Sequence, residues 1–269
     1  MASSLDSIGH FTKTVEDSAL LLNVTAGKNE LDATTSLKKE DDYTNQLSSD
    51  IKGIKIGIPK EYFVKGLDPE IKENVEKAVK FYEDNGAKIE EISLPHTDYA
   101  IATYYIIQPA EVSSNLARYD GIRFGNSRDF FGEEAKRRIM LGTFTLSVGY
   151  YDAYYKKAMK VRTLIINDFE EAFKKVDVII TPVSPTMPWK LGEKANDPLK
   201  MYLSDVLSAP VNLAGIPGLS VPTGFINELP VGMQILGPHF SESLLFKVGH
   251  AYEIQHKWYQ RSPKWIIKL

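Results

Sequence analysis

The first regular hydrophobic spacing in the chain predicts a short helix near the N-terminus. Thr14 is followed three residues later by Asp17, a spacing typical of a helix N-terminal cap, and an apolar run from Ala19 to Val24 comes next. We therefore expect a helix over residues 14–26. The polar segment 28–50 that follows shows neither helical nor alternating periodicity, so we expect a connector there.

Two alternating segments enclose a second helical pattern. Residues 53–59 and 87–94 alternate apolar and polar side chains, as half-buried strands do. Between them, Asp68 and Pro69 are suited to cap and begin a helix that runs to about Asn85. This order predicts a strand–helix–strand unit with parallel strands and a right-handed connection.

The middle of the chain, residues 98–175, is predominantly helical in its spacing. We expect Pro109, the segment 121–132 and Gly149 to interrupt it, because proline and glycine break helical patterns. We therefore expect three or four helices in this segment, packed as a layer.

The last third of the chain returns to an alternation of strands and helices. We expect strands over residues 177–182, 219–225 and 231–236, and helices around residues 199–208 and 241–258. Strands that alternate with helices favour an α/β fold with a mixed β-sheet covered by helices on both faces. We interpret residues 1–269 as a single α/β domain that contains the connector 28–50.

Composition narrows the class of protein. With 269 residues, 43% of them hydrophobic, the chain can bury a substantial core, and the absence of cysteine excludes disulfide scaffolds and thiolate metal sites. We find no signal peptide and no spanning segment, and therefore expect a cytoplasmic protein. A net charge of −3 gives no basic field that would attract a phosphate backbone.

Several motifs carry a resemblance to a known family. Two in the middle of the chain are Lys136–Thr143 and Gly149–Tyr155, and two nearer the C-terminus are Met201–Asp205 and Asn212–Pro217. Together they resemble the amidase signature family, and within it the A subunits of glutamyl-tRNA(Gln) and aspartyl-tRNA(Asn) amidotransferases. Asn115–Gly121 adds to the match with that branch.

The resemblance implies that catalysis and glutamine recognition lie in different parts of the subunit. In the family, a nucleophilic serine, its cis-peptide serine partner and a lysine precede the segment that matches Ala2–Asp6, so we assign no catalytic residue to this chain and expect it to be inactive alone. It would form the glutamine-recognition part of the subunit. The ammonia released from glutamine would convert Glu-tRNA(Gln) to Gln-tRNA(Gln) in a heterotrimer with the B and C subunits. The tRNA, ATP and Mg²⁺ would bind mainly to a partner subunit, with no cofactor in this chain.

Three residues are the candidates for binding glutamine. By position in the motifs, Arg138, Asp205 and Tyr104 match the family's glutamine-contacting arginine, aspartate and tyrosine, although the neighbouring Tyr105 is an alternative for the last. The chemistry agrees: a guanidinium grips a carboxylate with two parallel hydrogen bonds, a carboxylate accepts from an ammonium, and a tyrosine flanks a ligand with its ring and hydroxyl.

Ordinary structural roles compete with this interpretation. Arg138 lies four residues after Glu134, which on a helix gives a common surface ion pair, and Asp205 would lie on the polar strip of its helix. Tyr104 belongs to an apolar run that is typical of a core. The resemblance favours binding for Arg138 and Asp205 and leaves both roles open for Tyr104.

Other functions stay as alternatives. The chain resembles a fragment of a general amide hydrolase as well, or a non-catalytic scaffold with the same fold. The spacing of His250, Glu253 and His256 does not match the histidine pair of a metal-binding helix, so we assign no metal site.

Overall fold

The computed structural model describes residues 1–38, 41–63, 66–194 and 197–262. The chain forms two compact units, each built from three segments. Unit 1 comprises Met1–Ile8, Leu94–Glu171 and Gly192–Gly215, and unit 2 comprises Gly9–Ser93, Ala172–Leu191 and Ile216–Leu269. The single-domain interpretation stays a prediction, because this grouping does not say whether either unit folds alone.

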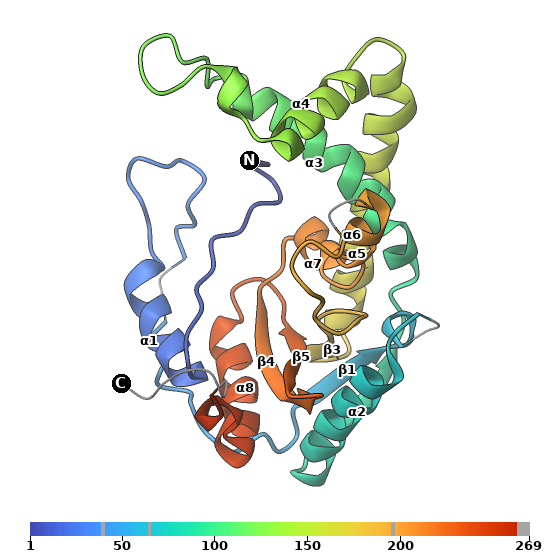
Figure 1. The fold of residues 1–269 in the computed structure, drawn as a ribbon. Coiled ribbons are helices and arrows are strands. Elements are labelled where there is room, and N and C mark those ends of the chain that lie inside the picture. Colours follow the sequence, from blue (N-terminus) through green and yellow to red (C-terminus); the bar gives the residue numbers. More distant parts are fainter. Residues whose placement is uncertain (39–40, 64–65, 195–196, 263–269) are drawn as a thin grey trace. The chain divides into compact units, whose positions relative to one another are not determined.

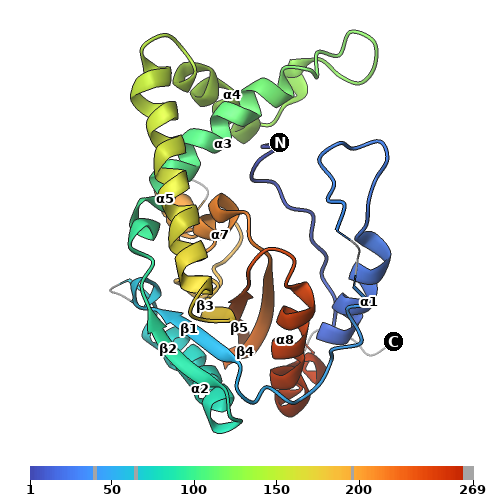
Figure 2. The same ribbon diagram turned by 180° about the vertical axis from the view of Figure 1, so that it is seen from behind.

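Unit 2 contains one mixed five-stranded sheet in the order β2-β1-β3-β5-β4 (Figures 1 and 2). Its strands are β1 (Lys55–Pro59), β2 (Lys88–Ile92), β3 (Val178–Pro182), β4 (Gly218–Ile226) and β5 (Leu229–Leu236), and its helices are α1 (Val15–Thr25), α2 (Pro69–Asp84) and α8 (Glu242–His256). The strands β1, β2 and β3 pair in parallel, whereas β5 is antiparallel to both β3 and β4. The predicted parallel strand–helix–strand unit and the mixed α/β sheet are confirmed.

Local capping explains where the first two helices begin. The Thr14 hydroxyl accepts a hydrogen bond of 3.0 Å from the Asp17 amide, and the Asp68 carboxylate accepts one of 2.9 Å from the Glu70 amide. Each cap satisfies an amide that has no partner within its own helix. Both predicted starts are confirmed, and the described part of the connector 28–50, which leaves out residues 39 and 40, contains no helix or strand.

The core of unit 2 lies on one face of the sheet, against α2 and α8. Ile180 and Ile235 from neighbouring strands are fully buried there, and the Tyr82 hydroxyl of α2 donates a 3.0 Å hydrogen bond to the Val248 carbonyl of α8. On the opposite face, the adjacent Ile179 and Leu236 are buried as well. Both faces of the sheet are therefore covered, as the apolar strands predicted.

The β4–β5 hairpin closes with a two-residue turn. Asn227 and Glu228 both adopt left-handed backbone conformations, with φ of 49° and 67°. Two such residues in succession match the twist of the strands on either side. Asparagine adopts this conformation readily, which explains why the chain reverses here.

Unit 1 is helical in its described residues. Its helices are α3 (Ala100–Leu116), α4 (Glu133–Thr145), α5 (Lys156–Phe173, whose last two residues belong to unit 2), α6 (Pro198–Leu203) and α7 (Ala209–Ala214). A π-helical turn over Tyr151–Tyr155 leads directly into α5. The predicted breaks at 121–132 and at Gly149 are confirmed.

The predicted interruption at Pro109 is wrong, because α3 continues through it. A proline inside a helix lacks the amide that would donate to the carbonyl four residues earlier, here that of Tyr105. Tertiary packing outweighs this loss: Pro109 is buried where α3 crosses α4, in the upper part of Figure 1. An added Cβ on Gly142 of α4 would lie only 1.8 Å from the Pro109 carbonyl oxygen.

Glu253 of α8 has a structural role in unit 2. Its two carboxylate oxygens accept hydrogen bonds of 2.9 and 3.1 Å from the Val15 amide, at the first turn of α1. Burial raises the pKa of the Glu253 carboxyl above its ordinary value; the Val15 amide opposes this shift, and the charges of Asp17 and Glu16 add to it. The buried carboxylate thus joins two helices that are far apart in sequence.

No helix among the described residues is both long enough and apolar enough to cross a membrane.

We expect Gly142→Ala to destabilise the protein by at least about 2 kcal/mol, because the new methyl group must push α3 and α4 apart. Urea unfolding followed by circular dichroism measures this. Gly9→Ala is the matched control: no atom lies within 4 Å of its added Cβ, so we expect a change below about 0.5 kcal/mol. Equal midpoints for the two variants would show that the crossing tolerates a side chain.

We expect Glu253→Gln to change the pH dependence of stability. A carboxyl whose pKa is raised in the folded state binds its proton more tightly there than in the unfolded chain, so the stability that it contributes is lost as the pH rises through the raised pKa. The free energy of unfolding of the variant should therefore improve relative to the unmodified protein as the pH rises above the ordinary pKa of a glutamate. Urea unfolding at several pH values tests this, and parallel curves would contradict it.

Candidate functional site

The three predicted binding residues all belong to unit 1 and lie on three different elements. Tyr104 is on α3, Arg138 is on α4, and Asp205 follows α6. Tyr104 lies five residues before Pro109, and Arg138 lies four residues before Gly142, so each is about one turn from the close crossing of α3 and α4. The crossing therefore brings these two side chains to one place.

Asp205 lies in a turn, not on the helix predicted over residues 199–208. That segment forms two short helices, α6 and α7, separated by a turn over residues 204–208. Pro210 favours the break, because a missing amide costs least in the first turn of a helix, and α7 starts anew at Ala209.

Tyr105, and not Tyr104, contacts Asp205 directly. The Tyr105 hydroxyl donates a 2.9 Å hydrogen bond to Oδ2 of Asp205. The Tyr105 ring also stacks on Tyr202 of α6, with ring centroids 3.9 Å apart, and meets the edge of Tyr104 at 5.1 Å. Tyr202 stands three residues before Asp205 in the motif Met201–Asp205, but the sequence pattern gave no reason to single it out.

Arg138 combines its ordinary helical partner with the candidate site. Its Nε donates a 2.8 Å hydrogen bond to Oε1 of Glu134, which is the ion pair expected from their spacing. The guanidinium carbon also lies 5.7 Å from the centre of the Tyr105 ring, and the Arg138 charge acts to lower the pKa of the Tyr104 hydroxyl. Only 18% of the Arg138 side chain is exposed, compared with 47% of the neighbouring Arg137 side chain. Arg138 therefore forms the expected ion pair with Glu134 and also belongs to the candidate site.

The electrostatics of this cluster keep both phenols neutral. Burial, followed by the negative charge of Asp205, raises the pKa of Tyr105 far above its ordinary range. Burial also raises the pKa of Tyr104; Arg138 opposes the shift, and Asp205 and Asp6 reinforce it. For Arg138, burial lowers the pKa, but Glu134 and the two tyrosines outweigh it and give a net rise. Both tyrosine hydroxyls therefore keep their protons at neutral pH, beside the positive charge of Arg138.

The N-terminal segment Met1–Ile8 is attached to the same unit by side chains. Arg162 donates to the Ser4 carbonyl at 2.8 Å and to the Leu213 carbonyl at 2.9 Å, and Asn212 donates to the Leu5 carbonyl at 2.9 Å. These bonds join α5, α7 and the segment that holds Asp6. The sequence reasoning missed Asp6, whose charge reaches Tyr104.

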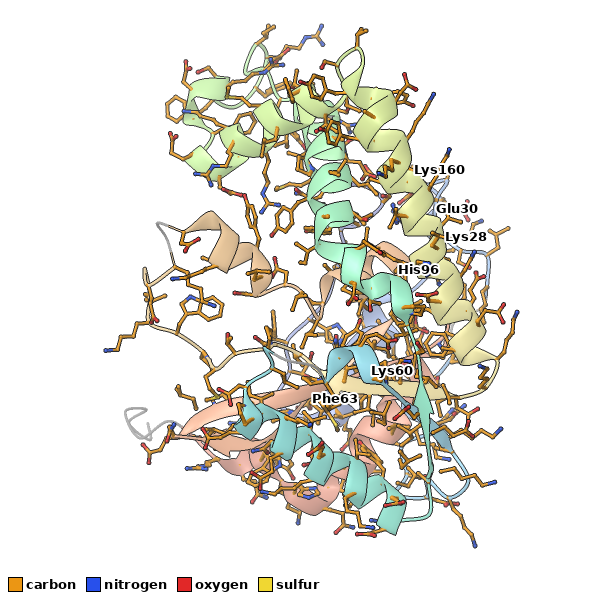
Figure 3. All side chains as sticks on the ribbon, turned by 90° about the vertical axis from the view of Figure 1, so that its right-hand side faces the viewer. Lys28, Glu30, Lys60, Phe63, His96 and Lys160 are labelled. Atoms are coloured by element: carbon orange, nitrogen blue, oxygen red, sulfur yellow. The ribbon has the colours of Figure 1, made fainter. Side chains whose placement is uncertain are left out.

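His96 is paired with Asp168 within unit 1. The Asp168 carboxylate accepts a 2.8 Å hydrogen bond from the His96 amide, and its other oxygen lies 2.9 Å from Nδ1 of the ring. His96, which Figure 3 labels, lies in the 3₁₀ turn Pro95–Tyr99 just before α3, and Asp168 belongs to α5. This pair fixes the start of the helix that carries Tyr104 and Tyr105.

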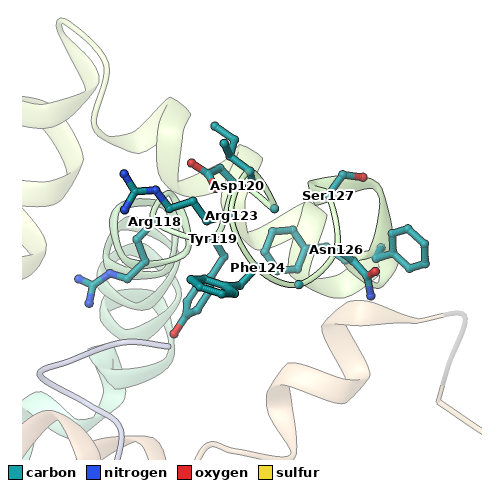
Figure 4. Close-up of a pocket in the computed structure, with 12 residues that line it drawn as sticks. Arg118, Tyr119, Asp120, Arg123, Phe124, Asn126 and Ser127 are labelled. Atoms are coloured by element: carbon teal, nitrogen blue, oxygen red, sulfur yellow. Dashed lines mark hydrogen bonds between the residues drawn. The ribbon is translucent and has the colours of Figure 1, made fainter.

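A hollow of about 710 Å³ lies elsewhere in unit 1, within the loop between α3 and α4 (Figure 4). All of its lining residues come from the segment 118–131, and none of the three predicted binding residues is among them. Figure 4 shows the guanidinium groups of Arg118 and Arg123 at one end and Asn126 at the other. A hollow ringed by a single loop brings no distant residues together, so we do not take it as the site.

Comparisons with known proteins place these features in a family. The family model described as Amidase matches residues 1–246. The A subunit of glutamyl-tRNA(Gln) amidotransferase from Carboxydothermus hydrogenoformans is 54% identical, in an alignment that covers 98% of this chain and 57% of that protein. The chain thus spans little more than half the length of the curated relatives that it matches.

Solved structures of related proteins share the fold of this chain. The crystal structure of the glutamyl-tRNA(Gln) amidotransferase A subunit from Thermotoga maritima matches with a TM-score of 0.79 and 44% identity, covering 94% of this chain and 53% of that one. A bacterial aryl acylamidase of the amidase signature family matches with a TM-score of 0.74 at 24% identity, which shows the shared fold alone. From the family match along most of its length and from this fold, we conclude that the chain belongs to the amidase signature family.

Proposed function

We propose that this chain is the glutamine-recognition part of the A subunit of a tRNA-dependent amidotransferase. The observation that carries the proposal is the gathering of Tyr104, Arg138 and Asp205 around Tyr105 in one unit. An identity of 54% to the A subunit of a glutamyl-tRNA(Gln) amidotransferase supports the same assignment. A cation and an anion near one another suit a ligand that carries both charges.

In this proposal each end of glutamine has its own partner. Arg138 binds the α-carboxylate, because its planar fork can donate two parallel hydrogen bonds to the two oxygens. Asp205 accepts from the α-ammonium, which can only donate. Tyr104 flanks the ligand with a neutral hydroxyl that donates or accepts. The side-chain amide would then extend away from this pair toward the groups that hydrolyse it.

The chemical step belongs to other residues. We place no catalytic group in this chain, since the serines and the lysine that the resemblance implies precede the segment Ala2–Asp6 in the family. The ammonia would pass to a partner subunit, where it would convert Glu-tRNA(Gln) to Gln-tRNA(Gln), in a cytoplasmic heterotrimer with the B and C subunits. ATP, Mg²⁺ and most of the tRNA contacts would belong to that partner, with no cofactor in this chain.

We expect glutamine to raise the stability of the chain. A ligand present at 100 times its dissociation constant adds about 2.7 kcal/mol to the free energy of unfolding when it binds only the folded state. Thermal unfolding with increasing L-glutamine measures this, and butyramide, an amide without either charge, is the control. Stabilisation by butyramide would favour a general amide hydrolase, and no response to either compound would favour a scaffold.

We expect Arg138→Ala to raise the KM for glutamine at least about tenfold, because a charged hydrogen-bonded partner of the ligand is lost. The measurement needs an enzyme reconstituted with its partner subunits and with the remaining part of the A subunit. Amidation from free ammonia should be spared, since it bypasses the glutamine site.

The matched control is Arg137→Ala. Arg137 also pairs with Glu134 and stands on the same helix, but it is more exposed and has no contact with Tyr104 or Tyr105 in the described structure. Its variant should keep the KM for glutamine. Equal effects of the two substitutions would remove Arg138 from the site.

A further inference from the structure

Tyr105 contacts both charged residues of the proposed site. Its hydroxyl donates to Asp205 at 2.9 Å, and the face of its ring lies 5.7 Å from the guanidinium carbon of Arg138. The aromatic face carries partial negative charge, so it attracts a guanidinium at this distance. A single side chain therefore touches the anion through its polar end and the cation through its ring.

The ring of Tyr105 is itself held in place. Tyr202 stacks on it with a centroid separation of 3.9 Å and an interplanar angle of 27°, and Tyr104 meets it edge to face. Packing of this kind restricts the ring to one orientation. The hydroxyl direction is fixed as a result, because it lies in the plane of the ring.

The orientation of the Asp205 carboxylate depends on contacts with other residues. Asp205 lies in the turn between α6 and α7, so no regular helix orients its side chain. Tyr105 donates to Oδ2, and among the described residues no side chain or backbone group donates to Oδ1. One oxygen is thus occupied by the protein and the other is open to an ammonium group.

We propose that Tyr105 is a positioning residue of the glutamine site: its hydroxyl orients the Asp205 carboxylate toward the ligand ammonium, and its ring holds the Arg138 guanidinium toward the ligand carboxylate. The inference rests on the proposed function. It adds that the separation between the two charges, and hence the selection of an α-amino acid, is set by one aromatic side chain that does not itself bind the ligand.

A neutral hydroxyl is required for this role. The pKa of Tyr105 is raised by burial and by Asp205, so the hydroxyl keeps its proton and stays a donor at physiological pH. A purely structural Tyr105 would instead fill space between α3 and α6. In that case Tyr105→Phe would alter stability without altering which ligand groups are recognised.

Calorimetric titration with three ligands separates these roles. The ligands are L-glutamine, glutaramic acid, which lacks the α-ammonium, and γ-aminobutyramide, which lacks the α-carboxylate. Tyr105→Phe keeps the ring and removes only the hydroxyl. We expect it to weaken the binding of glutamine and γ-aminobutyramide about tenfold, the loss typical for a hydrogen bond to a charged group, and to leave glutaramic acid unchanged.

Two further variants complete the test. Tyr105→Leu removes the ring as well, so we expect all three ligands to bind more weakly. Tyr119→Phe removes an exposed hydroxyl in the loop after α3, outside the cluster around Tyr105, so we expect all three affinities to be unchanged. Circular dichroism melting of each variant establishes that it is folded.

The outcomes distinguish this inference from the proposed function. If the unmodified chain binds glutamine and Tyr105→Phe binds all three ligands as tightly, the positioning role is wrong and the glutamine site stands. A uniform loss for all three ligands in Tyr105→Phe would likewise overturn the selective role of the hydroxyl. If the unmodified chain binds none of the three ligands, both the proposed function and this inference fall.

Discussion

The contact between the Gly142 backbone and the Pro109 carbonyl is the constraint on which the candidate site depends. Two helices that carry ordinary side chains at their crossing keep their axes about 8–10 Å apart. A glycine at the crossing permits a closer approach, and here no side chain at position 142 would fit. Because Tyr105 and Arg138 stand about one turn from this point on their helices, the approach brings an aromatic face within reach of a guanidinium.

Local signals in the sequence predict unit 2 well because its elements are specified by neighbouring residues. Thr14 and Asp68 cap their own helices, and Asn227 turns its own hairpin. The alternation of the strands depends only on which face is buried. In each of these cases, the interaction that fixes the structure lies within a few residues of the pattern that predicts it.

The errors concern interactions between distant residues. Pro109 breaks helices in local terms, yet α3 continues through it where it packs against Gly142, 33 positions further on. The contact between Tyr105 and Asp205, which the sequence did not suggest, is a hydrogen bond across 100 positions. Motifs therefore indicated the candidate residues, whereas the network that connects them in the structure was not predictable from local patterns.

The ion pair between Arg138 and Glu134 is compatible with ligand binding on energetic grounds. Glu134 is roughly half exposed, and an exposed pair at this helical spacing contributes only about 0.3–0.5 kcal/mol. It uses the Nε side of the guanidinium and therefore leaves the terminal nitrogens for other acceptors. A ligand carboxylate that formed two charged hydrogen bonds in a more buried setting would gain more than this pair provides. Glu134 thus keeps the largely buried guanidinium paired in the free protein without excluding the contact with glutamine proposed above.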